Sequence, residues 1–355
     1  MSYVTIKEVA QEAEVSVPAV SQVLNNTGRI SDATRQRVLD AIAKLNYIPN
    51  SAARSMRSSL TKTIGLLVPD IRNSYFASLI SAVTEELSKN GYVCLIGSSG
   101  ESVKGQDTFL RSLLSQRIDG TIIVPQGTIS PGLKRFLETD LPVVFLDRSI
   151  SGIGQDSHIP LIDSDPLPGI EKAIQSARAL GHSSIGFVHG PIAESPSLKE
   201  RQDVFASVAA ELLGDDGAVI AEPTDALSAI TGLLDRGVRT FIFGYSPDAL
   251  VAIGYFRDHG LVIGKDVSMI SFDDIPLFEL ATPAISVISQ QVITMGVRGA
   301  RTLLGLMRAK NSSHPGPSRA ENLRIPTEFI ARESMVDFSA DPRYRDTTAS
   351  GPRGV

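Results

Sequence analysis

The sequence of 355 residues has no tryptophan and a single cysteine, Cys94. One thiol cannot form an internal disulfide, so a disulfide framework is excluded and a reducing compartment is the natural one. Cys94 lies within the apolar run 92–96, and we interpret it as a small core residue rather than a reactive thiol.

Targeting and catalytic signals are also missing. No basic and then apolar leader opens the sequence, and no apolar run reaches the ~18 residues of a membrane span, so we expect a cytoplasmic protein with no membrane partner. There is no P-loop and no Gly-x-Ser-x-Gly elbow, and the five histidines are scattered rather than grouped with cysteine as metal ligands. The Gly-Ser-Ser-Gly run at 97–100 is a lone, weak signal. We therefore predict no enzyme activity and no cofactor.

Charge is divided unevenly along the chain, although the overall balance is only −5. Residues 1–62 contain eight Lys/Arg against five acids, a balance of +3, and the remainder carries −8. A mildly basic head on an acidic body fits a polyanion-binding module joined to a module that stays off nucleic acid.

The basic head has the pattern of three short helices with polar caps. Thr5 and Glu8 have the spacing of a capping box, in which the hydroxyl accepts from a backbone N–H and the carboxylate reaches back. Ser16 and Ser31 are placed to cap a second and a third helix, and apolar residues recur at helical spacing. Two helices joined by a tight turn and followed by a third predict a helix-turn-helix headpiece over residues 1–49.

From residue 63 onward, continuous apolar runs alternate with amphipathic stretches, which is typical of parallel α/β folds. Several predicted helices end at a glycine that feeds the next strand: Gly91, Gly181, Gly237 and Gly260. The predicted strands cover residues 64–68, 93–97, 120–124, 143–147, 159–162, 184–188, 240–243 and 267–272. We expect a core of two doubly wound parallel-sheet lobes over residues 63–335.

The connections and the end of the core follow from the same pattern. We place a crossover between the lobes near residues 147–162 and a return near 286–290. The polar, Pro/Gly/Ser-rich segment 336–355 is predicted to be a disordered tail.

Particular residues indicate a family. They are Val4-Thr5-Ile6-Lys7-Glu8-Val9-Ala10, Val15-Ser16, Val20-Ser21, Val23-Leu24-Asn25, Ser31, Thr34-Arg35, Val38 and Leu45-Asn46-Tyr47-Ile48-Pro49-Asn50, followed in the core by Ile64-Gly65-Leu66-Leu67-Val68-Pro69-Asp70-Ile71, Asp119-Gly120, Gly181-His182, Gly190-Pro191 and Phe272-Asp273-Asp274. Together they closely resemble the lactose-repressor (LacI/GalR) family of bacterial transcription regulators over about residues 3–333. The resemblance implies a headpiece that binds double-stranded operator DNA and a periplasmic-binding-protein-like core that binds a small molecule.

The resemblance assigns roles within the headpiece. The family's specificity positions correspond to Val17, Pro18 and Gln22, which would read base edges in the major groove. Phosphate contacts, which orient the protein without reading sequence, suit the small polar residues. The implied DNA-binding residues are Thr5, Ser16, Val17, Pro18, Ser21, Gln22, Asn25, Tyr47, Asn50, Ala53 and Met56.

Residues 50–62 resemble the family's hinge helix and linker. Met56 stands where the family usually has leucine, and the resemblance implies that it wedges into the minor groove and kinks the duplex. The alternative is that Met56 only packs against a partner hinge. Because so short a helix is marginal alone, we expect it to fold only when two copies and DNA are present.

In the core, the resemblance implies a ligand between the two lobes, at the carboxyl ends of the strands. Carboxylates accept hydrogen bonds from hydroxyls, arginine donates in a fork, and aromatic rings stack on a sugar ring, so the residue types fit a polyol. Taken singly, each has an ordinary alternative, such as a helix-capping aspartate or a surface ion pair. The candidates are Asn73, Tyr75, Phe76, Asp147, Arg148, Arg201, Tyr245 and Asp273.

The candidate set departs from the family at one point. Relatives often carry an Asn-Asp pair where this chain has Tyr245-Ser246, so no relative's ligand transfers directly. We predict a pentose, a nucleoside or a related small sugar, and a phosphorylated sugar remains open. His189 and Lys199 either favour such an anion or are ordinary surface residues.

These expectations combine into one hypothesis. The protein is a repressor of a catabolic operon, and ligand-driven closure of the lobes changes the spacing of two headpieces in a homodimer, whose symmetry requires a near-palindromic operator. The tail lacks apolar heptads, which favours a dimer over a tetramer. The alternatives are a solute-binding protein for sugar uptake, disfavoured by the headpiece, and an enzyme built on the α/β body.

Gln22 generates the first prediction. Many relatives have arginine at this position; arginine favours guanine, whereas glutamine pairs with adenine, each by about 1–3 kcal/mol. Selection of operator DNA by the wild type and by Gln22→Arg should therefore show a change from adenine to guanine at the base pair beneath residue 22. An unchanged preferred base would contradict this assignment.

Overall fold

The computed structural model describes residues 4–48, 60–150, 159–191, 195–221, 225–310 and 322–339. The chain divides into two compact units, Met1–Thr61 and Lys62–Val355, and the division falls within the predicted linker. The second unit contains both lobes of the core.

The headpiece consists of α1 (Ile6–Glu12), α2 (Val17–Asn25) and α3 (Asp32–Leu45). The predicted caps are all present: the side chains of Thr5, Ser16 and Ser31 each accept from a backbone N–H of the helix they precede. In the capping box the Thr5 backbone N–H donates to Glu8 Oε2 at 2.6 Å, and this bond holds the pKa of Glu8 below its usual value. The buried core of the unit comprises Val9, Ala10, Ala13, Val20, Val23, Val38, Ala41 and Tyr47.

The first lobe has a six-stranded sheet in the order β11-β5-β4-β3-β1-β2, and every pairing in it is parallel. Its strands are β1 (Thr63–Val68), β2 (Val93–Ser98), β3 (Gly120–Ile123), β4 (Val143–Leu146), β5 (Leu161–Asp165) and β11 (Leu323–Pro326). Its helices are α5 (Ser74–Lys89), α6 (Val103–Ser115), α7 (Pro131–Leu137) and α13 (Val292–Lys310).

The second lobe repeats this plan, with the strand order β12-β10-β9-β8-β6-β7 and only β12 antiparallel. Its strands are β6 (Ile185–Val188), β7 (Ala218–Ile220), β8 (Thr240–Phe243), β9 (Ser268–Phe272), β10 (Ser286–Ser289) and β12 (Glu328–Ile330). Its α-helices are α8 (Leu167–Ala179), α9 (Pro196–Leu213), α10 (Ala226–Asp235), α11 (Ser246–Asp258) and α12 (Pro276–Leu280). The predicted fold class, two doubly wound lobes behind a helical headpiece, is confirmed.

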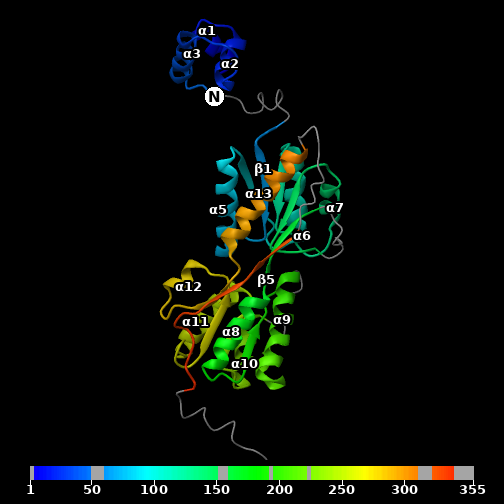
Figure 1. Cartoon of the computed structure of the whole chain (residues 1–355), viewed down its shortest axis with the longest axis vertical. Helices are drawn as coiled ribbons and strands as arrows, with labels where there is room; N and C mark the ends of the chain where they lie inside the picture. Colours follow the sequence, from blue (N-terminus) through cyan, green and yellow to red (C-terminus); the bar gives the residue numbers. More distant parts are fainter. Residues whose placement is uncertain are drawn as a thin grey trace, which may run out of the picture. The chain divides into compact units, whose positions relative to one another are not determined.

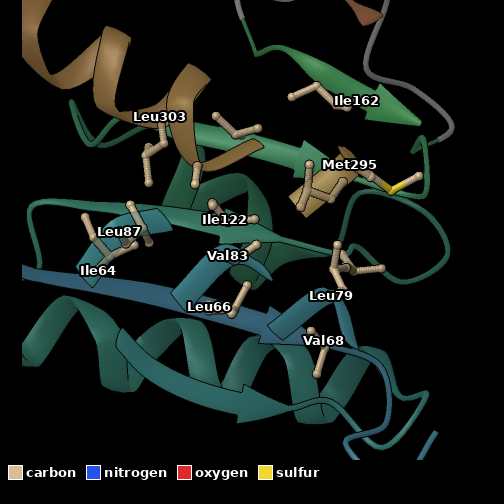
Figure 2. Packing of buried hydrophobic residues seen from close by; sticks show 14 of the residues in the cluster. Ile64, Leu66, Val68, Leu79, Val83, Leu87, Ile122, Ile162, Met295 and Leu303 are labelled. Carbon is tan, nitrogen blue, oxygen red and sulfur yellow. The ribbon is translucent and has the colours of Figure 1, made fainter. Parts of the chain in front are cut away.

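Each sheet is covered by helices on both faces (Figure 1). In the first lobe α5 and α13 lie side by side on one face, where Leu79, Val83, Met295 and Leu303 pack against Ile122 and other strand residues (Figure 2). The opposite face is covered by α6 and α7. Burial on both faces explains why these strands appear in the sequence as continuous apolar runs.

The chain passes between the lobes at three places. It leaves the first lobe after β5, returns between β10 and α13, and crosses again between β11 and β12. The predicted crossover at 147–162 is therefore wrong: β4 and β5 pair in the same sheet, with Leu146 opposite Ile162. The predicted return near 286–290 is correct, and the third crossing was missed because β11 and β12 are very short.

The predicted tail begins too early. The Val336 backbone N–H donates to Ser268 Oγ at 2.8 Å, and Phe338 is buried against the His182 ring, with 4.6 Å between ring centroids. His182 Nε2 also bonds the Val336 carbonyl oxygen. The second lobe therefore holds the chain through Ser339; the rest of the predicted tail lies outside the described residues.

Two helical glycines should respond oppositely to alanine. A Cβ on Gly105, in the first turn of α6, would lie 2.1 Å from the Ser99 carbonyl oxygen, whereas a Cβ on Gly305 in α13 would meet nothing within 4 Å. We expect Gly105→Ala to lower the free energy of unfolding by about 1–3 kcal/mol through overpacking. Gly305→Ala should raise it by up to about 1 kcal/mol through helix propensity. Chemical denaturation of both variants checks this, and equal effects would contradict the close approach at Gly105.

Candidate functional site

The headpiece presents one face of α2 to solvent. Val20 and Val23 are buried against α1 and α3, so the intervening residues point outward. Ser16, Pro18, Gln22 and Asn25 are exposed, Val17 and Ser21 are half-buried, and Thr5 is exposed at the start of α1. Seven of the predicted DNA-binding residues therefore lie at the surface of the helix-turn-helix.

The turn after α2 is shaped around Gln22. Gly28 has a φ of +77°, and a Cβ there would lie 2.9 Å from Gln22 Cδ. The amide of Gln22 thus lies against Gly28, a position whose positive φ favours glycine. Asn26 caps α2 in the left-handed conformation, and its side chain accepts from Arg35 Nη1 at 2.9 Å. The Asn26–Arg35 bond connects the end of α2 to α3.

Tyr47 behaves differently from the other predicted DNA-binding residues. Its side chain is buried in the headpiece core, so its structural role is packing rather than presentation at the surface. Asn50, Ala53 and Met56 lie outside the described residues.

All eight predicted ligand-binding residues line one cavity in the core unit. Asn73, Tyr75, Phe76, Asp147 and Arg148 come from the first lobe, and Arg201, Tyr245 and Asp273 come from the second. Sequence reasoning missed four further lining residues: Ser195, Ser197, Leu198 and Gln290. The signal for Gln290 was available, since it ends the return segment that the sequence analysis identified.

The first-lobe side of the cavity centres on Asp147. This residue follows β4 with a φ of +65°, and its Oδ1 accepts from the buried Tyr75 hydroxyl at 2.7 Å. Burial and the negative charge of Asp147 raise the pKa of Tyr75 well above its usual value, so Tyr75 remains a donor. Asn73 caps α5 by accepting from the Tyr75 backbone N–H, which fixes the backbone position from which the Tyr75 side chain extends.

Arg148 is buried next to Asp147 and paired with a residue that the sequence analysis did not select. Its Nη1 donates to Glu101 Oε2 at 2.8 Å and its Nη2 donates to Glu101 Oε1 at 3.1 Å. Gln126 Oε1 accepts a further bond from Nη1 at 3.1 Å. The guanidinium lies 5.6 Å from the centre of the Phe76 ring. Arg148 is therefore held rigidly at the cavity wall.

The second-lobe side centres on Asp273, which follows β9 with a φ of +69°. Its two carboxylate oxygens accept from Ser246 Oγ and from Gln290 Nε2, both at 2.6 Å. Gln290 Oε1 in turn accepts from Ser164 Oγ at 2.6 Å, so the network reaches β5 of the first lobe. Burial raises the pKa of Asp273, and the positive charge of Arg201 opposes that rise.

Arg201 and Tyr245 complete the wall. The Arg201 guanidinium lies over the Phe272 ring at 4.4 Å and donates from Nη1 to the Gly244 carbonyl oxygen at 2.6 Å. Tyr245 precedes α11, and Gly190 leaves room for it, because a Cβ there would lie 2.6 Å from Tyr245 Cβ. By contrast, His189 and Lys199 do not line the cavity; Lys199 forms an exposed ion pair with Asp203.

The cavity joins buried carboxylates, fixed guanidinium donors and aromatic rings around a small space. Such a set exchanges hydrogen bonds with several hydroxyls at once and offers ring faces to C–H groups. Within the part of the chain that the structure describes, no three His, Cys, Asp or Glu residues gather as metal ligands do. None of the described helices is both long and apolar enough to cross a bilayer.

Asp163 should make stability depend on pH. It lies in β5, 3.3 Å from Arg324 Nε, and burial raises its pKa to about 6, against the lowering effect of Arg324; the charges of Glu200 and Asp147 add to the rise. Because the folded pKa exceeds the unfolded one, this group's contribution is present at low pH and is lost as pH rises through about 6. The unfolding free energy of the wild type minus that of Asp163→Asn should therefore fall between about pH 4 and pH 7. Denaturation at several pH values measures it, and a constant difference would contradict the shift.

Comparison with known proteins agrees with both units. The model of bacterial regulatory proteins of the lacI family matches residues 5–50, and a periplasmic-binding-protein-like domain matches residues 174–335. The ribose operon repressor of Bacillus subtilis is 31% identical over 339 residues, covering 93% of this chain and 98% of the relative.

Solved structures share the fold. The lac repressor dimer bound to operator and an anti-inducer superposes with a TM-score of 0.78 at 23% identity, covering 94% of this chain and all of that one. A LacI-family regulator from Enterococcus faecium with bound ribose gives a TM-score of 0.65 at 23% identity, covering 78% of this chain and 99% of that one. The helix-turn-helix headpiece, the two-lobed core and the similarity over nearly the full length all agree. The chain therefore belongs to the LacI family of bacterial transcription regulators.

Proposed function

We propose that this protein represses a catabolic operon by binding a near-palindromic operator as a homodimer, and that a small sugar in the core cavity controls this binding. The observation that carries the proposal is the convergence of eight ligand-binding candidates, chosen from the sequence, on one cavity. Ribose is the first candidate ligand, and other pentoses and nucleosides follow.

The choice of ribose rests on the chemistry of the wall and on the relatives. The cavity wall holds both donors, such as Arg148 and Arg201, and acceptors, such as Asp147 and Asp273, as a ring with several hydroxyls requires. The similar B. subtilis protein is a ribose operon repressor, and the similar E. faecium regulator was solved with bound ribose. These relatives support the proposal for this chain.

On the DNA side, we propose that Val17, Pro18 and Gln22 read base edges while Thr5, Ser16, Ser21 and Asn25 contact phosphates. Residues 1–49 would form the DNA-binding unit and 50–62 the hinge and linker, followed by the sensing and dimerisation core. An operator is cytoplasmic DNA, so the protein would act there.

Coupling would follow from the two-sided wall. A sugar that bonds Asp147 and Arg148 in one lobe and Arg201 and Asp273 in the other stabilises one relative arrangement of the lobes. A coupling of about 1–3 kcal/mol changes operator affinity about five- to 150-fold. A solute-binding role in sugar uptake would use a similar cavity but would not account for the helix-turn-helix headpiece.

The proposal is tested with genomic operator fragments selected by the purified protein, followed by mobility shifts with and without ribose. We expect salt-sensitive DNA binding, because phosphate contacts release counterions, and a ribose-dependent change in affinity. If no genomic fragment binds, the regulator proposal fails; if fragments bind but no sugar or nucleoside changes the affinity, the ligand class is wrong.

Asp273→Asn separates the two functions. The amide keeps the shape of the side chain but loses an acceptor, so we expect ribose to bind about ten- to a hundredfold more weakly while operator affinity without ligand is unchanged. Calorimetry and mobility shifts measure the two effects. The control is Asp258→Asn, which changes an exposed aspartate paired with Arg257 and should alter neither.

A further inference from the structure

Glu101 lies outside the cavity wall and pairs with Arg148 of that wall, and the ligand-binding proposal gives it no role. It lies in the loop between β2 and α6, with a φ of +54°. The loop is held closely by the first turn of α6, since Gly105 approaches the Ser99 carbonyl oxygen too tightly for a Cβ. The fold therefore keeps the Glu101 carboxylate at a fixed place beside Arg148.

Glu101 occupies the hydrogen-bond donors of Arg148 that a ligand in the cavity could otherwise use. Both Nη atoms donate to Glu101 in a two-bond fork, and Nη1 also reaches Gln126. The buried Nε is without a hydrogen-bond partner among the described residues, and lies 3.7 Å from Asp147 Oδ2. A phosphate is recognised by the same fork that Glu101 occupies, whereas a hydroxyl needs only one N–H.

The balance of charge points the same way. The described residues that line the cavity include two arginines, Arg148 and Arg201, and two aspartates, Asp147 and Asp273. Burial raises the pKa of Asp273, but even with that carboxyl protonated, Glu101 and Asp147 offset both guanidinium groups. The cavity thus has no surplus positive charge to hold an anion.

Tyr245 adds no charge of its own. Burial, and then the nearby charge of Glu101, raise its pKa to about 12, so its hydroxyl stays neutral. Neither His189 nor Lys199, the two other candidate anion partners, lines the cavity.

We propose that Glu101 is a positioning residue that acts through Arg148 and makes the cavity accept neutral sugars and reject sugar phosphates. This inference rests on the proposed sugar-sensing function and specifies that the sensed sugar is uncharged. It assigns to one residue outside the cavity wall a choice between two groups of intracellular metabolites.

The test compares ribose with ribose 5-phosphate by calorimetry on the full-length protein. The wild type should bind ribose at least about tenfold more tightly than ribose 5-phosphate, because a compensated guanidinium gives little attraction to an anion. Glu101→Gln removes one negative charge and frees the fork, so the ratio should fall by about tenfold or more.

Two further variants separate selectivity from damage. Glu101→Asp keeps the charge and should keep most of the discrimination. Glu86→Gln weakens another Glu–Arg contact, the 2.7 Å bond from the exposed Arg301 Nε to Glu86 Oε1. Neither residue lines the cavity, so this variant should leave the ratio unchanged. A folded Glu101→Gln protein, judged by its thermal unfolding, that keeps the wild-type ratio would overturn the proposal. So would a wild type that binds both sugars equally.

Failure of the ribose assignment is distinguishable. If the wild type binds neither sugar, the pentose prediction is wrong, and inorganic phosphate becomes the probe of selectivity. Tighter binding of phosphate to Glu101→Gln than to the wild type, by about tenfold or more, would support the role of Glu101. Equal binding would reject it.

Discussion

The burial of two carboxylates, Asp147 and Asp273, constrains the arrangement of the core. They follow equivalent strands, β4 and β9, in lobes that share one strand order, and both adopt a left-handed backbone conformation that an L-residue takes only at a cost. A buried carboxylate needs donors or a compensating charge: Tyr75 donates to Asp147, whose charge the Arg148 guanidinium also offsets, and Ser246 and Gln290 donate to Asp273. These groups thereby fix the centre of the cavity wall on each side.

The same requirement links the cavity to the connections between the lobes. Gln290, the partner of Asp273, lies on the return segment and accepts from Ser164 beside the first crossing. Thr327 on the third crossing bonds the Asp165 carbonyl oxygen at 2.8 Å, and Gln291 bonds that of Pro326, also at 2.8 Å. The crossings therefore form one hydrogen-bonded set, so a ligand that engages Asp273 acts on groups next to the point where the lobes would move.

Much of the secondary structure could be predicted from the periodicity of apolar residues and from the helix caps. Thr5, Ser16 and Ser31 cap the helices as predicted, because a cap depends on a few adjacent residues. The family resemblance predicted eight members of the cavity wall, several of them just after strands, because parallel strands bring their carboxyl ends together. The features that were missed depend on residues far apart in the sequence. Strand β11 is only four residues long and pairs with β5, with Leu323 opposite Ile162. The role of Glu101 follows only from its ion pair with Arg148.

The three crossings also determine the order in which the protein can be completed during synthesis. The first lobe consists of β1 to β5, α13 and β11, so its chain is interrupted by nearly all of the second lobe. Helix α13, which covers one face of the first sheet, emerges only after β10 of the second lobe. Until α13 is synthesised, the part of this sheet face that Met295 and Leu303 cover stays open, whereas the buried residues of the two core clusters of the second lobe, all within 170–288, are already present.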